Sequence, residues 1–245
     1  MKNKAKILIV LVVLGIVLIS VISLYNNTRR DSFLDRVDGK IYYLKREDEI
    51  LKLYTSDANL KNEKLVYSHY KKGKIDDENY NDNVTDFRYY PESHVIEFEA
   101  MYNGQWSIFR MDEGDAEPRY IKNADEFKIL EDYRVVSLDV DYVHLETDKL
   151  KIFDKEGSIF LEENGEVKCI KKYRGFVKSD IRGLVGYIPQ GLSPDSRYLI
   201  YGTTGSFTGI GYFLGINKYK RYIMDLDTLK SHEYINVERV QWVDE

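Results

Sequence analysis

The chain of 245 residues contains one cysteine, Cys169, so it cannot form an intramolecular disulfide. Its fold must therefore depend on a hydrophobic core, for which roughly 215 residues after the N-terminal segment are sufficient. Cys169 alternates with charged neighbours, which predicts a buried strand residue, with a reactive thiol as the alternative. It also lies far beyond the N-terminal apolar run, which excludes a lipid-bearing cysteine at the end of that run.

Positive charge is in deficit. Without residues 1–25, which contain three lysines and no acidic residue, 33 basic residues face 41 acidic ones, a net charge of −8. The basic pair Lys71-Lys72 is followed after three residues by the acidic run 76–78, so the charges are not segregated. Because phosphate backbones and anionic lipid headgroups repel such a domain, we expect no nucleic-acid partner.

Motifs of known catalytic or cofactor sites are missing. No Gly-x-Ser-x-Gly elbow occurs, and the glycine-rich segment 202–215 lacks the Gly-Lys-Ser/Thr ending of a phosphate loop. The histidines do not follow metal-ligand spacings such as His-Glu-x-x-His; they are His69, His94, His144 and His232. We therefore expect no metal, no cofactor and no enzymatic activity.

Charged residues are absent from Ile7 to Tyr25, which read ILIVLVVLGIVLISVISLY. At about 1.5 Å per helical residue, these 19 residues approach the ~30 Å hydrocarbon layer of a membrane. Backbone groups in hydrocarbon must bond within the segment, so we predict a transmembrane helix that tolerates Gly15. A cleaved signal peptide is the alternative, although its apolar core is usually about 7–15 residues long.

The lysines before this helix predict its orientation. Lys2, Lys4 and Lys6 outnumber Arg29 and Arg30 on the far side, which favours a cytoplasmic N-terminus. We therefore predict a cytoplasmic segment 1–6, a signal-anchor helix 7–25, a linker 26–37 and an extracytoplasmic domain 38–245. The expected location is the outer face of a bacterial cytoplasmic membrane.

Short alternating or apolar runs separated by turn residues dominate the rest of the chain, and they predict an all-β domain. The 21 tyrosines suit half-buried strand faces. Four turn pairs, where glycine can adopt the positive φ of a tight hairpin, indicate antiparallel meanders: Asp38-Gly39, Asn103-Gly104, Glu156-Gly157 and Asn164-Gly165. The predicted strands include 128–130 and 135–138, besides runs such as 95–100, 198–201 and 240–243.

An internal repeat reduces the number of all-β folds that fit the sequence. The run from Leu192 to Tyr201, Leu-Ser-Pro-Asp-Ser-Arg-Tyr-Leu-Ile-Tyr, is followed by an aromatic strand and an acidic turn at 222–227. The segment from Val84 to Asp112, which contains Pro91, follows the same pattern, and a degenerate copy begins at Asp38.

These segments resemble the blades of TolB-type and dipeptidyl-peptidase-like β-propellers, which share WD40-like repeats. Ser196 stands where the family's Ser-Pro-Asp-Gly turn has glycine. The resemblance covers about half of the exported domain and implies a small propeller; at about 40–50 residues per blade, four or five blades fit. The strand 238–244 is expected to complete the first blade. A sandwich or open meander remains the alternative.

The predicted binding site is the glycine-rich loop 202–215, whose aromatic residues form the tip: Phe207, Tyr212 and Phe213. An ordinary inter-strand loop is the alternative. The acidic loop 76–83 lacks the spacing of a calcium site, and Asp139 and Asp141 share a strand face without an evident pocket.

We expect a membrane-anchored, extracytoplasmic, non-enzymatic module that binds or scaffolds a protein or an envelope ligand. The competing hypothesis is a cell-envelope hydrolase, or a protein that binds a carbohydrate or peptide, with a loop site of unfamiliar sequence.

Overall fold

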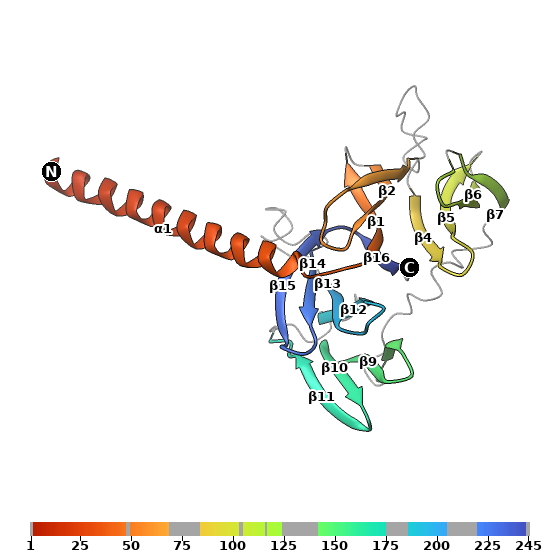
Figure 1. Ribbon diagram of the computed structural model, residues 1–245. Coiled ribbons are helices and arrows are strands. Elements are labelled where there is room, and N and C mark those ends of the chain that lie inside the picture. Colours follow the sequence, from red (N-terminus) through yellow and green to blue (C-terminus); the bar gives the residue numbers. More distant parts are fainter. Residues whose placement is uncertain are drawn as a thin grey trace. The chain divides into compact units, whose positions relative to one another are not determined.

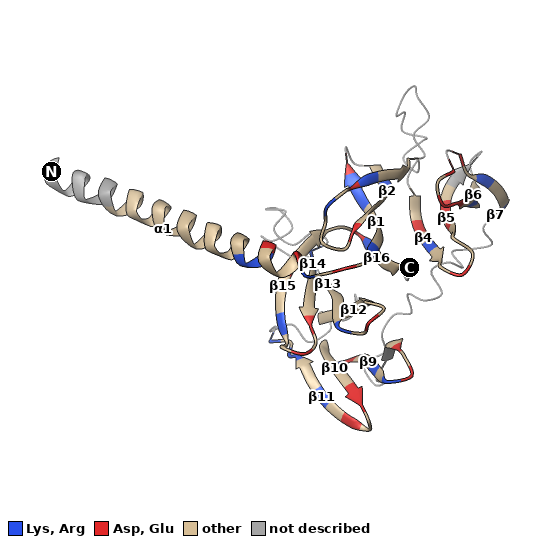
Figure 2. Ribbon diagram, viewed as in Figure 1, with Lys and Arg blue, Asp and Glu red and all other residues tan. Residues whose placement is uncertain are grey.

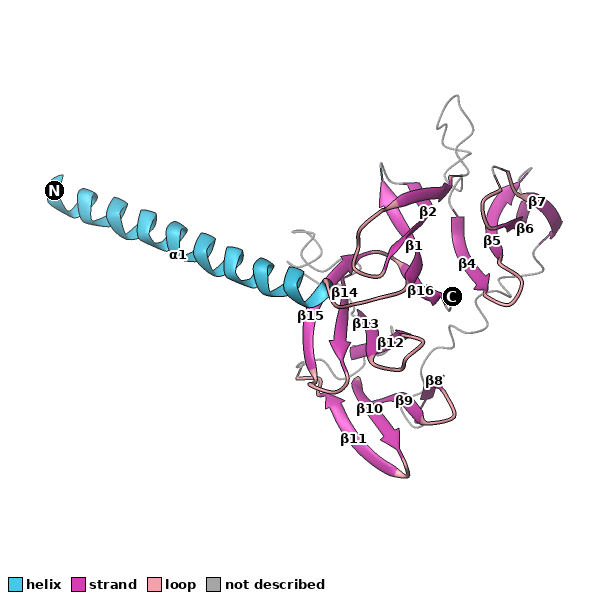
Figure 3. Cartoon of the chain, in the orientation of Figure 1, coloured by secondary structure: helices cyan, strands magenta, loops and turns pink. Residues whose placement is uncertain are grey.

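The computed structural model in Figure 1 divides into two compact units, Met1–Asp38 and Gly39–Glu245. The first unit contains one helix, α1 (Lys2–Leu34), and the second contains only strands and their connections among the described residues (Figure 3). The structure describes residues 2–47, 50–68, 84–102, 105–115, 117–123, 142–174, 186–204 and 220–243.

Helix α1 is long and apolar enough to cross a membrane. The 24 residues from Leu11 to Leu34 have a mean hydropathy of 1.9 in their most apolar part, and that part is unburied. Residues 7–25 of the helix carry no charge; Lys2, Lys4 and Lys6 precede them, and Arg29 and Arg30 follow near the C-terminal end, where Figure 2 shows charged residues. Hydroxyl groups within the apolar stretch find acceptors inside the helix: Ser20 Oγ donates to the Ile16 carbonyl at 2.9 Å. The helix continues through residues 26–34, which the sequence had assigned to a linker.

The second unit contains four antiparallel sheets of four strands each among the described residues, which confirms the all-β, propeller-like meander. Three sheets consist of consecutive strands. In the first sheet, the C-terminal strand β16 pairs with β1, so the order is β16-β1-β2-β3, as the sequence predicted.

The strand bounds follow the turn residues of the chain. The first sheet contains β1 (Lys40–Glu47), β2 (Ile50–Asp57), β3 (Lys64–Tyr67) and β16 (Arg239–Val243). The second contains β4 (Val84–Tyr90), β5 (Val95–Tyr102), β6 (Gln105–Asp112) and β7 (Arg119–Asn123). The third contains β8 (Tyr142–Glu146), β9 (Leu150–Lys155), β10 (Ser158–Glu163) and β11 (Glu166–Lys171). The fourth contains β12 (Gly186–Leu192), β13 (Tyr198–Thr204), β14 (Lys220–Asp225) and β15 (Lys230–Asn236). The predicted strands 128–130 and 135–138 and the turn Asn103-Gly104 lie outside the described residues.

The hairpin turn between β9 and β10 has two consecutive residues with positive φ, Glu156 at 49° and Gly157 at 71°. This backbone matches the twist of the flanking strands, which explains why glycine follows an acidic residue there. Gly157 also accepts a backbone bond from Tyr187 of β12 at 2.9 Å, so the hairpin contacts the fourth sheet. A Cβ on Gly186 would come within 2.3 Å of the Gly157 Cα, so this contact requires glycine.

The Ser-Pro-Asp turn between β12 and β13 is organised by Ser193. Its hydroxyl oxygen accepts from the backbone N–H groups of Arg197 at 3.1 Å and Tyr198 at 2.8 Å, and it donates to Asp195 Oδ1. Ser196 has φ = 60°, a left-handed conformation that glycine adopts without strain. The serine therefore carries a local conformational cost.

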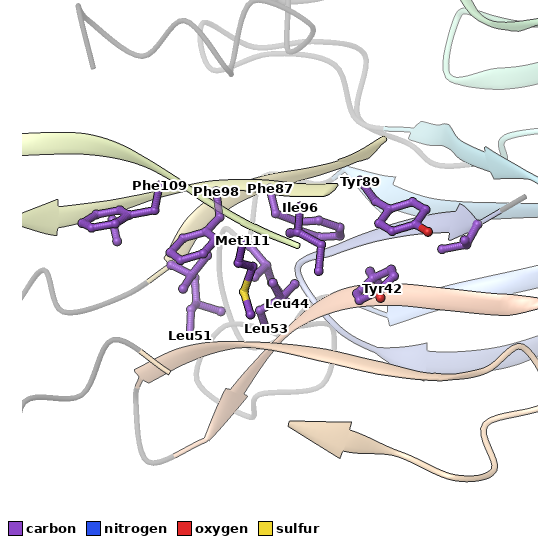
Figure 4. Close-up of a cluster of buried hydrophobic side chains, with 13 residues drawn as sticks. Tyr42, Leu44, Leu51, Leu53, Phe87, Tyr89, Ile96, Phe98, Phe109 and Met111 are labelled. Carbon is purple, nitrogen blue, oxygen red and sulfur yellow. The ribbon is translucent and has the colours of Figure 1, made fainter. Parts of the chain in front are cut away.

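The described residues form two hydrophobic cores between the sheets. The first joins the β16-β1-β2-β3 and β4–β7 sheets and contains a row of rings, Phe87, Phe98 and Phe109, paired across β4, β5 and β6 (Figure 4). The Phe98 and Phe109 rings stack with centroids 5.5 Å apart. The second core joins the other two sheets through side chains that include Ile152, Leu199 and Met224.

Strand β16 also binds β4 of the second sheet. Gln241 Oε1 accepts from the Tyr89 backbone N–H at 2.9 Å, and Gln241 Nε2 donates to the Tyr89 carbonyl at 2.9 Å. Arg239 forms an ion pair with Asp86. The last described strand therefore connects the first and second sheets.

The prediction that Cys169 is buried is wrong. Cys169 lies on a strand, as expected, but its side chain is exposed. The reason is that β11 is the outermost of the described strands of its sheet and has a described neighbour, β10, on one side only. Four of its six residues face solvent. Alternation with charged residues indicated a strand but could not distinguish an inner from an outer one.

Replacing Ser196 by glycine is expected to stabilise the protein by about 0.5 kcal/mol. A residue with a Cβ pays roughly 1–2 kcal/mol for a left-handed backbone, and glycine removes this cost. Glycine also has more conformational entropy in the unfolded chain, which cancels part of the gain. Chemical denaturation of the full chain in detergent measures the difference. Ser196→Ala is the control, because alanine meets the same backbone cost; equal stabilisation by both variants would contradict the explanation.

Gln241→Ala is expected to lower the free energy of unfolding by about 1–3 kcal/mol, because it leaves two backbone groups of buried Tyr89 without their partner. The matched control is Gln105→Ala, which removes only an exposed side-chain bond with Asn123. Denaturation midpoints of the two variants measure the contrast. Similar losses in both would show that Gln241 does not tie β16 to β4.

Candidate functional site

The residues predicted to bind a partner, Phe207, Tyr212 and Phe213, lie outside the described residues. The acidic loop 76–83 and the pair Asp139 and Asp141 lie outside them as well. Within the part of the chain that the structure describes, no group of three or more His, Cys, Asp or Glu side chains could hold a metal ion. The described polar clusters must therefore be assessed on their own geometry.

A polar cluster that contains groups from two sheets surrounds Glu113, in the turn after β6. Its backbone N–H donates to the His94 carbonyl at 2.8 Å, which joins the β6–β7 turn to the β4–β5 turn. Lys40 and Tyr42 reach it from β1, where residues two apart share a face. Tyr89 arrives from β4. The Glu113 cluster, defined as these five residues, thus contains groups from the first and second sheets.

Both carboxylate oxygens of Glu113 are engaged. Oε1 accepts from Lys40 Nζ and, at 3.0 Å, from the Tyr42 hydroxyl. Oε2 accepts from the Tyr89 hydroxyl at 3.1 Å, and His94 Nδ1 lies 3.4 Å away. The rings of Tyr42 and Tyr89 stack with centroids 4.9 Å apart, so their hydroxyls converge on the same carboxylate.

These contacts determine the charge state of the cluster. Burial would raise the pKa of Glu113, but the bonds from Lys40 and Tyr42 outweigh it and lower the pKa to about 2. Burial, followed by the charge of Glu113, raises the pKa of Tyr42. At neutral pH the carboxylate is ionised and this phenol is protonated, so neither is poised to exchange a proton with a substrate.

Position within the cluster decides which groups a ligand could reach. The side chain of His94 is 68% exposed, whereas those of Lys40 and Glu113 are 27% and 29% exposed. His94 therefore forms the accessible rim, and Glu113 acts as an anionic clamp between two sheets. The arrangement favours a role in positioning the β1 and β4 surfaces over a role in acid–base chemistry.

A second tyrosine cluster joins the third and fourth sheets. Lys171 of β11 lies over the rings of Tyr187 and Tyr201, at 5.4 and 5.5 Å from their centroids. Its Nζ also donates to Ser231 Oγ at 3.3 Å. Tyr201 stacks on Tyr222 with centroids 5.3 Å apart. Cation–π contacts thus hold the outer strand of one sheet against the next.

Sequence reasoning missed both clusters. Tyrosine was recognised as a half-buried strand residue, but nothing local connects Lys40 to Glu113, which lie 73 residues apart. The alternation of Lys40 and Tyr42 on one strand face was the single available signal. It identifies a polar edge of β1 but not the carboxylate that binds there.

Glu113→Gln is expected to lower the free energy of unfolding at pH 7 by about 1–3 kcal/mol, because bonds to a charged group are lost. The folded-state pKa of about 2 lies below the unfolded value of 4.5, so this stabilisation is present above pH 4.5 and disappears as pH falls through about 2. Denaturation at several pH values tests this. Glu92→Gln, at an exposed turn, serves as the control, and a wild-type advantage over E113Q that persists at pH 2 would contradict the assignment.

Comparison with known proteins gives only distant similarity. No family model matches the chain, and no curated protein matches it. Among solved structures, TolB from Acinetobacter baumannii is 11% identical with a TM-score of 0.27, covering 80% of this chain and 41% of its own. A putative TolB from Agrobacterium tumefaciens is 9% identical with a TM-score of 0.25, covering 84% and 72%. The tricorn protease is 10% identical with a TM-score of 0.26, covering 82% of this chain and 18% of its own.

The chain therefore spans less than half of the Acinetobacter TolB. TolB is among the solved structures that the chain resembles, as the Ser-Pro-Asp turn indicated, and these neighbours are β-propeller proteins. At TM-scores of this size the likeness carries no argument about activity or partners. The propeller-like organisation rests on the strand order of the four sheets.

Proposed function

We propose that the protein is a membrane-anchored, extracytoplasmic, non-enzymatic module that binds or scaffolds another protein. Helix α1 supplies the anchor, and the lysines at positions 2, 4 and 6 favour a cytoplasmic N-terminus. The sheets of the second unit then present their outer strands on the far side of the membrane.

The observation that carries this proposal is the exposure of strand β7. All five of its residues are exposed, and Tyr120 and Ile121 are 47% and 44% exposed. Among the described strands, β7 is the outermost of its sheet and pairs with β6 on one side. An open edge offers backbone donors and acceptors to an extended segment, and apolar side chains beside it add affinity.

Charged residues beside these apolar groups support a selective surface. Arg119 and Lys122 flank Tyr120 and Ile121 on β7, and such charges on an edge strand oppose pairing between copies of the same chain. A partner segment with acidic residues would complement them. The aromatic loop residues predicted from the sequence, Phe207, Tyr212 and Phe213, are a second surface for the same partner.

The proposal predicts a specific partner in a pull-down from detergent-solubilised membranes with the tagged full-length protein. Ile121→Glu is expected to reduce recovery at least several-fold if β7 is the binding edge, because a charge enters an apolar contact. The triple variant with alanine at 207, 212 and 213 is also expected to recover less partner if the glycine-rich loop contributes to binding. Glu92→Ala, at an exposed turn, is the matched control and should leave recovery unchanged.

Each outcome assigns a role. Loss in one variant alone identifies the binding surface, and loss in both indicates a composite surface. If neither the wild type nor any variant captures a specific partner, the scaffold function is contradicted and the small-ligand or hydrolase hypothesis is favoured.

A further inference from the structure

Two carboxylates lie side by side inside the second sheet. Asp86 of β4 and Glu99 of β5 are direct cross-strand partners, so their side chains project from the same face. Their residues are 1% and 0% exposed, respectively. Acidic residues are almost never this buried unless they are paired or neutralised.

The carboxylate oxygen atoms of this pair differ in how many hydrogen bonds and ion pairs they form. Asp86 Oδ1 accepts from the Phe87 backbone N–H at 2.8 Å and forms the ion pair with Arg239 of β16. Asp86 Oδ2 and both carboxylate oxygens of Glu99 are buried and accept no hydrogen bond from the described residues. Three acceptor oxygens therefore lie close to one compensating cation.

Charge balance shows what the pair requires. Arg239 compensates one negative charge, and the charge of Arg88 of β4 has a smaller effect in the same direction on the pKa of Asp86. A second ionised carboxylate in this buried position would cost several kcal/mol. One proton removes that charge and also converts an acceptor of Glu99 into a donor that can bond to Asp86 Oδ2.

A metal ion fits the pair less well than a proton does. The described residues supply no third carboxylate, histidine or cysteine ligand at this position, and Arg239 already provides the positive charge. The remaining cross-strand neighbour of Glu99, Ile108 of β6, is apolar. Two carboxylates carry two negative charges, which the Arg239 guanidinium and one shared proton would neutralise.

We propose that Asp86 and Glu99 form a proton-binding site that holds one shared proton at neutral pH and couples the protonation state of β4 and β5 to the attachment of β16 through Arg239.

Burial raises the pKa of Asp86 to about 6, against the opposing charge of Arg239 and the Phe87 N–H. Burial and the nearby charge of Asp86 raise the pKa of Glu99. Because these folded-state values exceed the unfolded ones, the stability that the pair contributes is complete below about pH 4 and is lost as pH rises through 6 and beyond. This is the reverse of the dependence expected for Glu113.

The test uses the full chain in detergent and infrared spectroscopy of its carboxyl groups. At pH 7, where ordinary carboxylates are ionised, the wild type should show the carbonyl band of one protonated carboxyl group per chain, and Glu99→Gln should remove it. Glu97→Gln is the matched control, since Glu97 lies two residues away on the same strand face and is bonded to Arg110 and Tyr90. It should keep the band.

Thermal unfolding gives an independent readout. Glutamine mimics protonated Glu99, so E99Q should melt about 2–4 °C above the wild type at pH 8 and at the same temperature near pH 4. Absence of the protonated band in the wild type at pH 7, or its persistence in E99Q, would overturn the proposal. The wild-type band requires no variant, so the test still decides if E99Q does not fold.

Discussion

The pairing of β16 with β1 is the contact on which the rest of the β unit depends. It joins residues about 200 positions apart, from Lys40 opposite Val243 to Leu44 opposite Arg239. Closing a loop of that length costs on the order of 5 kcal/mol in chain entropy, which the ladder and its side chains must offset. In return, β1 is no longer an open edge, and Arg239 and Gln241 come to lie against β4.

Polar contacts between the first two sheets follow from that closure. Asp86 and Tyr89 of β4 bind β16, whereas Glu113 binds β1, so three connections meet along neighbouring strands. Their carboxylates differ in environment. Glu113 is part-exposed and receives several donors, which lowers its pKa, whereas desolvation dominates at Asp86 and raises its pKa. One junction therefore contains an acidic clamp that stays ionised and a buried pair that retains a proton.

Tyrosine supplies much of the remaining contact between sheets. Tyr42 stacks on Tyr89 at one junction, and Tyr187, Tyr201 and Tyr222 line the other beneath Lys171. A phenol combines a large apolar ring with a polar tip, so it can fill a core and still reach a carboxylate at its margin. Such contacts hold neighbouring sheets together, while β7, the outermost described strand of the second sheet, keeps all five of its residues exposed.

The internal repeat predicted that the C-terminal strand completes the first sheet. The sequence by itself determined the local features: the apolar helix, the alternating strands and the glycine turns. These depend on periodicity and turn chemistry, which act over a few residues. Only the tertiary structure decided that Cys169 faces solvent, that Glu113 binds Lys40 and that Asp86 and Glu99 are buried together. Those outcomes depend on which strand is outermost and on contacts between residues far apart in the chain, and no local pattern encodes either.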